Sequence, residues 1–239
     1  TLRENSSMSR ADMNKNPAEV AAMFDGVAKR YDLVNDILSL GRTKAWRKAA
    51  TKVIAPTAGM KILDMAAGTG SSSAPLAKAG ADVTAADFSE GMLGAGRKAR
   101  PHLPFTKADA LNLPFNDGEF DVFTISFGLR NTNDTDKALK EALRVVKPGG
   151  RLVVAEFSSP TWLPFRTIYS NYLMRALPWI ASKTSSNPDA YIYLAESIRA
   201  WPNQVALAAK IEAAGWRRVT WKNLTGGVVA VHIAHKDAR

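Results

Sequence analysis

The 239-residue sequence contains no cysteine and only three histidines. The absence of cysteine excludes disulfides, thiolate metal sites and thiol nucleophiles. His232 and His235 stand three residues apart in an expected strand, so they face opposite sides and form a poor metal-binding pair. We therefore predict no metal centre, and we interpret the histidines as core or surface side chains.

Long hydrophobic stretches are absent too, since no run reaches the length of about 18 residues that a membrane-spanning helix needs. The first residues are polar and lack the apolar core of a secretory signal. The remaining composition, 46% hydrophobic and 23% charged, is typical of a globular protein with a sizeable core. Together these features predict a cytoplasmic protein.

Acidic residues are in the minority, which gives a formal charge of +10 and a sequence pI near 9.9. Such a charge can indicate a nucleic-acid, anionic-membrane or anionic-ligand partner. The lysines and arginines are scattered, however, and no block of five or six occurs. We therefore weigh a generally basic globular protein against one that binds an anionic membrane surface.

The chain does contain a regular alternation of strands and helices. Residues 61–65, 82–86, 120–126 and 152–157 form near-continuous apolar runs, and a further short strand is expected to end at Asp109. Helical segments separate these strands. This order predicts a parallel sheet that is covered by helices on both faces.

Two further patterns refine the sheet. A helix is expected over residues 134–146, and residues 147–150 (KPGG) form a strong break before the fifth strand. The last two strands, 217–223 and 228–235, are joined through the turn residues 225–227. The short connection predicts a terminal hairpin, which makes the last strand antiparallel.

The same patterns predict how the chain is organised. Residues 1–16 are polar and are expected to be disordered, whereas 17–239 form a single domain. Within it, residues 17–56 form N-terminal helices and 160–202 form a helical insertion after the fifth strand. The insertion holds 8 of the 20 aromatic residues but only two acids. Its aromatic side chains either pack it onto the body or form an apolar cover over a substrate pocket.

The most informative local pattern is KILDMAAGTG at residues 61–70, followed 17 residues later by Asp87. A strand ends in Asp64 and a turn of small residues, a helix follows, and the next strand ends in a second acid. Small residues let the backbone approach a ligand, and the Asp87 carboxylate can accept hydrogen bonds from ribose hydroxyls. The pattern predicts an adenosyl ligand in a Rossmann-like sheet.

Three features favour S-adenosylmethionine over a dinucleotide. They are the expected antiparallel hairpin, the pair Asp109-Ala110 after the third strand, and the run RVVKPGG (144–150) before the fifth. The loop also matches G-x-G-x-x-G only if Ser73 replaces the last glycine. We therefore predict an α/β fold of the class I S-adenosylmethionine-dependent methyltransferases: a seven-stranded, mostly parallel sheet with an antiparallel last strand.

Four stretches resemble the signatures of the ubiquinone/menaquinone biosynthesis C-methyltransferases: residues 23–36, 127–131, 193–198 and 223–227. The resemblance extends over about residues 20–236. It implies methyl transfer from S-adenosylmethionine to a ring carbon of a polyprenylated hydroquinone. The run SSNPDAYIYL (185–194) is similar to the branch that converts demethylmenaquinol to menaquinol in menaquinone biosynthesis. A ubiquinone precursor, 2-polyprenyl-6-methoxy-1,4-benzoquinol, is the alternative acceptor.

The cofactor loop departs from the family's usual Asp-x-Ala-Gly-Gly-Thr-Gly-Asp at two positions. Ala67 stands where the family has a glycine, which requires an ordinary backbone conformation there. Ser71 replaces the final acid and so removes one carboxylate from the loop. Neither change abolishes cofactor binding, but both alter the contacts that the loop can make.

The loop pattern and the resemblance together give two sets of candidate site residues. The predicted cofactor-binding residues are Asp64, Gly68, Thr69, Gly70, Asp87, Phe88, Asp109, Ala110 and Ser126. The predicted catalytic residues are Arg130, Asn131, Tyr31, Asn35 and Asp36.

Each of the central candidates has a structural alternative. The Arg130 guanidinium stays charged, so it would lower a phenol's pKa or hold a water that takes the proton; alternatively, it forms a salt bridge that fixes its loop. Asp64 either orders the loop or meets the amino end of the methionine, and its alternative is a turn-capping acid. For Tyr31 the alternative is packing on a helix face.

The residues also weigh against other methyl acceptors. Methylation of a pyrimidine carbon generally needs a cysteine nucleophile, and methylases of base amines carry an Asn/Asp-Pro-Pro-aromatic motif where this chain has SFGL (126–129). The remaining alternatives are another lipid acceptor such as a sterol or phospholipid amine, an RNA methyltransferase, and a non-catalytic binding subunit. A prenylated substrate implies peripheral contact with the cytoplasmic face of a membrane and no nucleic-acid partner. A homodimer is left open.

Overall fold

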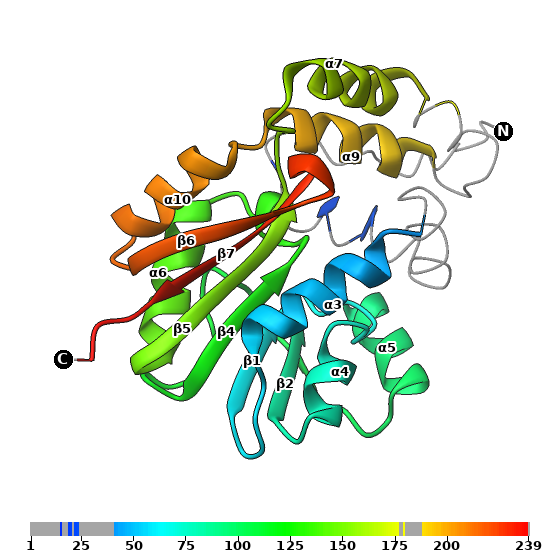
Figure 1. Ribbon diagram of the computed structural model, residues 1–239. Coiled ribbons are helices and arrows are strands. Elements are labelled where there is room, and N and C mark those ends of the chain that lie inside the picture. The colour runs from blue at the N-terminus through cyan, green and yellow to red at the C-terminus, as the bar shows by residue number, and fades with distance from the viewer. Residues whose placement is uncertain are drawn as a thin grey trace, which may run out of the picture.

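The computed structural model describes residues 15, 19–20, 22–23, 41–176, 179 and 188–238, with only the backbone for 176 and 188–190. Its centre is a seven-stranded sheet of order β3-β2-β1-β4-β5-β7-β6 (Figure 1). The strands are β1 (Lys61–Met65), β2 (Asp82–Asp87), β3 (Phe105–Lys107), β4 (Phe120–Ser126), β5 (Val146–Phe157), β6 (Arg217–Leu224) and β7 (Val229–His235).

The strand directions confirm the predicted sheet. β3, β2, β1, β4 and β5 pair in parallel, whereas β7 pairs antiparallel with both β5 and β6. The α-helices of the described residues are α3 (Thr43–Ile54), α4 (Ser73–Lys78), α5 (Glu90–Ala99), α6 (Thr135–Val145), α7 (Leu163–Asn171), α9 (Pro188–Ala200) and α10 (Gln204–Ala213).

Helices cover both faces of the sheet, as the apolar strands require. On one face, Ile54 of α3 and Leu76 of α4 pack with strand residues such as Val153. On the other face, apolar residues of α6 and α10, including Leu139 and Ile211, pack around strand residues in a second cluster. Figure 1 shows the sheet between these two layers. The near-continuous apolar strands are therefore explained by burial on both sides.

Residues 147–150 (KPGG) were predicted only to separate a helix from the fifth strand, but in the structure they are part of that strand. They follow the end of α6, but β5 already begins at Val146 and runs through them. Phe120 pairs with Val146 and Val122 with Arg151, so residues 147–150 face a single residue of β4 and form a bulge. Gly149 has a φ of +77°, which glycine adopts without strain. The strand was predicted too short because this pairing depends on β4.

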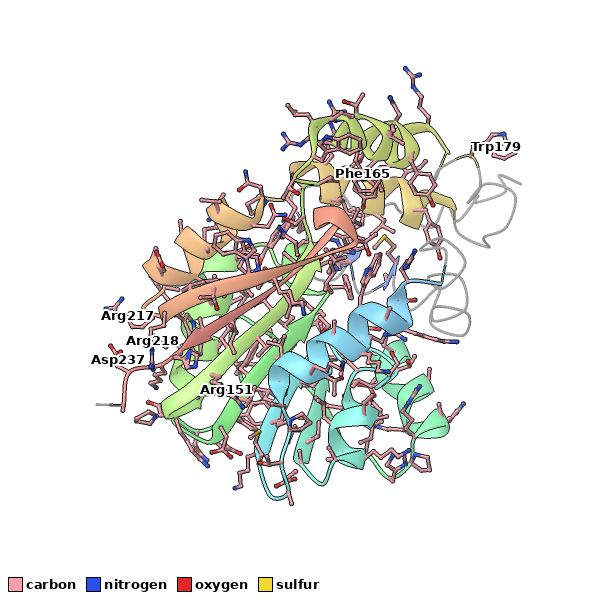
Figure 2. The ribbon with its side chains drawn as sticks, in the orientation of Figure 1. Arg151, Phe165, Trp179, Arg217, Arg218 and Asp237 are labelled. Carbon is pink, nitrogen blue, oxygen red and sulfur yellow. The ribbon has the colours of Figure 1, made fainter. Side chains whose placement is uncertain are left out.

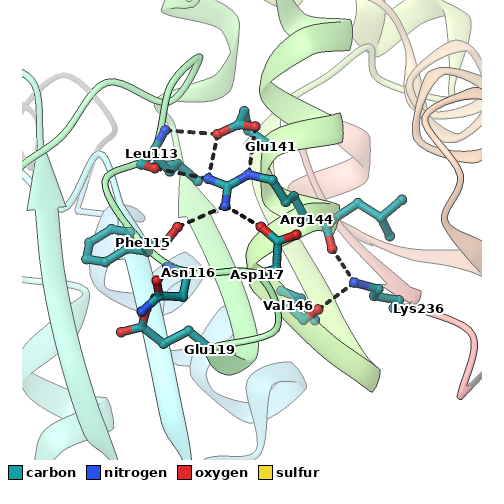
Figure 3. Close-up of polar contacts among 10 residues, drawn as sticks. Leu113, Phe115, Asn116, Asp117, Glu119, Glu141, Arg144, Val146 and Lys236 are labelled. Atoms are coloured by element: carbon teal, nitrogen blue, oxygen red, sulfur yellow. Dashed lines mark hydrogen bonds and ion pairs between the residues drawn. The ribbon is translucent and has the colours of Figure 1, made fainter.

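An arginine on α6 fixes the loop that follows β3 (Figure 3). Arg144 donates to the carbonyl oxygens of Leu113 and Phe115 at 3.0 and 2.8 Å, and to the Asp117 carboxylate at 2.7 Å. Its hydrogen bonds to Glu141 also lower the pKa of that carboxyl. The network therefore fixes residues 113–117 of the loop that also carries Asp109 and Ala110.

A helical layer lies over the carboxyl ends of β4 and β5. It consists of α7, a π-helical turn η3 (Tyr172–Ala176) and α9 (Figure 1). Leu173, Tyr191 and Ile198 form a buried cluster in which Phe157, at the end of β5, also packs. No helix among the described residues is long and apolar enough to span a bilayer.

Candidate functional site

A cavity of about 560 Å³ lies at the carboxyl edge of the parallel strands, beneath this helical layer. Ligands collect at this edge in open α/β sheets. Most of the predicted site residues line the cavity: Gly68, Thr69, Asp87, Phe88, Asp109, Ala110, Ser126, Arg130 and Asn131. Asp64 and Gly70 do not line it, and Tyr31, Asn35 and Asp36 lie outside the described residues, so their roles stay predictions.

Asp87 at the end of β2 organises one end of the cavity. Its two carboxylate oxygens accept the backbone N–H groups of Gly68 and Ser89 at 2.8 and 2.9 Å. A carboxylate offers about four acceptor positions, so ribose hydroxyls can share it with these two donors. Asp109 accepts the N–H of Leu111 at 2.9 Å and so stands fixed at the next strand end. These residues fit an adenosine group.

Asp64 stands behind the loop instead of facing the cavity. It is fully buried, and one carboxylate oxygen accepts the hydroxyls of Ser72 and Ser73 at 2.7 and 2.6 Å. Among the described residues, the other oxygen has no hydrogen-bond partner. Burial raises the pKa of Asp64 to about 6; the nearby Asp87 charge adds to this, and the two serine hydroxyls oppose it. The geometry favours the loop-ordering role.

Two non-glycine residues with positive φ lie side by side at the ends of β1 and β4. Ala66 has a φ of +56° and Phe127 of +59°, and both line the cavity. Ala67, by contrast, keeps the ordinary conformation that its side chain requires. A Cβ atom on Gly128 would overlap the Cβ of Ala66. Strained backbone of this kind often gathers at functional sites.

We expect Gly128→Ala to push the strand ends of β1 and β4 apart, because Ala66 has no flexible atoms that can yield. Overpacking of this type costs about 1–3 kcal/mol, and S-adenosylmethionine affinity measured by calorimetry should fall with it. Gly94→Ala is the matched control. Gly94 lies in α5 with open space around its Cβ position, so alanine there should stabilise the fold by about 0.5–1 kcal/mol. Unchanged affinity in Gly128→Ala would contradict the packing argument.

The opposite end of the cavity is aromatic. Trp46 of α3, Phe127 after β4 and Phe157 of β5 lie with ring centroids 5.1 to 6.0 Å apart. The Trp46 indole N–H donates to the Thr225 hydroxyl at 2.8 Å, which ties the β6–β7 turn to this wall. Further rings come from the helical layer: Phe165, Tyr169, Tyr172, Tyr191 and Tyr193.

Three tyrosines define the polarity of this aromatic end. Tyr193 is almost fully buried, and its hydroxyl donates to Oδ1 of Asn131 at 3.3 Å. Burial raises the pKa of Tyr169 well above its ordinary value. It also raises the pKa of Tyr172. Tyr169 and Tyr172 are therefore neutral at physiological pH, and the aromatic end suits a flat, apolar ring with a few oxygen atoms.

Arg130 lines the cavity beside two rings of its aromatic end. It donates to Oε1 of Glu156 at 2.9 Å and to the carbonyl of Phe127 at 2.6 Å, and its guanidinium lies 5.1 Å from the Phe157 ring centroid. Both charged side chains are buried, with 4% and 1% of their side-chain surface exposed. Arg130 lines the cavity whereas Glu156 does not. The positive end of the pair therefore faces the ligand space.

Comparison with known proteins identifies the family. A model described as the ubiE/COQ5 methyltransferase family matches residues 11–236. The chain belongs to this family. Named relatives of similar sequence include a demethylmenaquinone methyltransferase of Streptomyces avermitilis, 60% identical over 96% of this chain and 99% of the relative. Another, from Mycolicibacterium paratuberculosis, is 59% identical over 97% of this chain and 100% of the relative.

Solved structures share the fold of this ubiE/COQ5 family member. An S-adenosylmethionine-dependent methyltransferase from Thermotoga maritima superposes with a TM-score of 0.66 at 19% identity, covering 90% of this chain and 98% of that one. A Haemonchus contortus phosphoethanolamine N-methyltransferase 2, in complex with S-adenosyl-L-methionine, gives 0.58 at 15% identity over 80% of this chain and 52% of that one. At these identities the likeness shows the fold alone, and it confirms the predicted class I architecture.

Sequence reasoning missed three residues of this family member's cavity region. Glu156 was treated only as part of an apolar strand, although a single acid in the run 152–157 was a usable signal. Trp46 and Thr225 are 179 positions apart, so their contact could not be read from spacing. Rings of the aromatic insertion pack onto Phe157 and also line the cavity, and its role as a cover over a substrate stays a prediction.

Proposed function

We propose that the protein methylates a ring carbon of demethylmenaquinol to give menaquinol, with S-adenosylmethionine as the methyl donor. The observation that carries the proposal is that one cavity has two chemically different ends. Asp87 and Asp109 supply an adenosine-binding end, and a cluster of aromatic rings supplies an end for a flat acceptor. The two named relatives described above carry this activity in their names and match nearly the whole chain.

The chemistry places few demands on the protein. S-adenosylmethionine supplies an electrophilic methyl group on a sulfonium. When a hydroquinone loses a phenolic proton, electron density rises on the neighbouring ring carbon; a C–C bond can form there as the S–CH₃ bond breaks, and the ring then loses its proton. The residues must align the ring, exclude water and assist proton loss, and alignment alone contributes roughly 7–11 kcal/mol in model systems.

We assign the assistance of proton loss to Arg130. Its guanidinium stays charged, faces the cavity, and is held by Glu156 and by the Phe127 carbonyl. A positive charge beside a phenol favours the phenolate and so lowers the phenol's pKa. Asn131, held by Tyr193, lies next in the chain and can orient a ring oxygen.

The direct test is turnover with methyl-labelled S-adenosylmethionine and reduced demethylmenaquinone in detergent. We expect a menaquinone that is heavier by one labelled methyl group on the ring, detected by mass. The ubiquinone precursor serves as the parallel acceptor and should react more slowly. Cofactor binding without any product from the naphthoquinol would contradict the assigned acceptor and shift the proposal to another lipid.

The wider cellular setting is part of the proposal. A polyprenyl tail cannot remain in water, so we propose that the protein acts in the cytoplasm as a peripheral protein at the membrane surface. The formal charge of +10 supports attraction to an anionic leaflet. The sequence leaves the oligomeric state open, and analytical ultracentrifugation would show whether the protein forms a homodimer.

A further inference from the structure

The segment around helix α7 presents an unusual set of apolar side chains to water. Trp162 and Leu163 are each 67% exposed, Ile168 is 64% exposed, and Trp179, beyond the π-helical turn, is 66% exposed. Figure 2 shows Trp179 at the outer edge of the molecule and Phe165 between α7 and the body. Single exposed apolar residues are ordinary, but several that follow one another along one segment mark an interaction surface. We call Trp162, Leu163, Ile168 and Trp179 the α7 face.

The α7 face is continuous with the cavity. Ile168 is largely exposed and also lines the cavity, together with its helix neighbours Phe165 and Tyr169. An apolar path therefore runs from the outer surface across α7 to the aromatic end of the site. A globular protein gains nothing from such a path unless an apolar molecule uses it.

The charged residues near the α7 face indicate what kind of partner it binds. Residues 157–188 contain no aspartate or glutamate, whereas Arg166 and Arg175 are exposed. Arg166 is held by the Pro160 carbonyl, to which its Nε donates at 3.0 Å. Tryptophan and arginine without acids suit the interfacial zone of an anionic bilayer, where indole rings lie among head groups and basic side chains meet phosphate.

We infer that the α7 face docks on an anionic lipid bilayer and that α7 forms the rim over which the acceptor's tail enters from the membrane. The bilayer contact stands on the exposed face alone, whereas the tail route rests on the proposed function. A second copy of the chain is the competing occupant of the face. It would not require the run 157–188 without acids, or the opening towards the cavity.

The test compares vesicle binding of the full-length protein with that of Trp162→Ser/Leu163→Ser. Neither residue lines the cavity, and serine at position 162, which precedes α7, is a good helix cap. The probe is a vesicle of phosphatidylglycerol and phosphatidylcholine, read out by co-sedimentation. Val205→Ser is the matched control, because Val205 is 65% exposed on α10.

We expect the double variant to bind anionic vesicles at least tenfold more weakly than the wild type, and Val205→Ser to bind them as the wild type does. The wild type should bind pure phosphatidylcholine vesicles only weakly. Unchanged binding by the double variant, or equal binding to neutral vesicles, would overturn the inference. A third outcome would also overturn it: ultracentrifugation shows that the wild type is a dimer and the double variant a monomer, and the wild type does not bind vesicles.

Turnover separates this inference from the proposed function. We expect the double variant to methylate a tail-less demethylmenaquinol analogue at the wild-type rate and a long-tailed acceptor in vesicles at least tenfold more slowly. Equal rates on both acceptors would overturn the tail route. If the wild type methylates neither acceptor, the proposed function fails, while the vesicle result still decides the docking face.

Discussion

Arg130→Ala is expected to lower turnover strongly and to destabilise the fold. Arg130 and Glu156 are both buried, and alanine at position 130 would leave the Glu156 carboxylate without its charged partner. Removing one member of a buried pair costs about 3–5 kcal/mol. Loss of the positive charge at the cavity should lower turnover by about 100-fold or more, the usual effect of removing a preorganised electrostatic group. Urea unfolding and the labelled turnover assay measure the two effects.

A second variant separates catalysis from folding. Arg130→Met/Glu156→Gln removes both charges of the buried pair, and the glutamine oxygen still accepts from the N–H of Phe157, as Glu156 does at 2.8 Å. The Phe127 carbonyl loses a donor, so a residual loss of about 1–3 kcal/mol is expected. Turnover should remain about 100-fold down, with S-adenosylmethionine affinity changed by only a few-fold. Near-normal turnover in this double variant would show that Arg130 only fixes its loop.

The fold was predictable because its signals are local. Near-continuous apolar strands, helices between them, and acids at two strand ends placed β1, β2 and β4 within a residue of their observed bounds. The antiparallel hairpin followed from the turn at residues 225–227. The start of β5 was missed, since the bulge at residues 147–150 depends on the register with β4, which no local pattern contains.

The site was predictable where it follows strand ends and unpredictable where it depends on topology. Asp87 and Asp109 line the cavity because parallel strands end at one edge. Glu156 meets Arg130 only because β5 lies beside β4, with Ser126 opposite Ala155. The position of Asp64 in the cofactor loop was likewise predicted from the sequence. Its burial behind Ser72 and Ser73 was not, because burial depends on how the loop packs in the folded protein.

Asp64→Asn is expected to stabilise the fold, by a gain that develops as the pH rises from about 4 to 6. The pKa of Asp64 is raised from 3.8 to about 6, so the folded state binds this proton more tightly than the unfolded state. Stability is therefore lost as the pH rises from about 4 to 6, by about 3 kcal/mol in total. Asparagine carries no such charge, so its gain should be absent at pH 4 and complete at pH 8.

The measurement is the urea midpoint at both pH values, with Asp82→Asn as control, because Asp82 is exposed at the start of β2. Only Asp64→Asn should show a gain that depends on pH in this window. A gain of equal size at pH 4 and pH 8 would show that the carboxylate is not destabilised by burial.

The same variant is expected to bind S-adenosylmethionine at least tenfold more weakly at pH 8. A charge that destabilises the fold by about 3 kcal/mol needs a compensating role, and Asp64 lies directly behind the loop that carries Gly68 and Thr69 to the cavity. S-adenosylmethionine carries a sulfonium and an ammonium group, and a buried carboxylate attracts positive charge more strongly than an exposed one. Wild-type affinity should then fall below pH 6, as Asp64 becomes protonated. Calorimetry that finds equal affinities for the variant and the wild type at pH 8 would instead assign Asp64 to loop order alone.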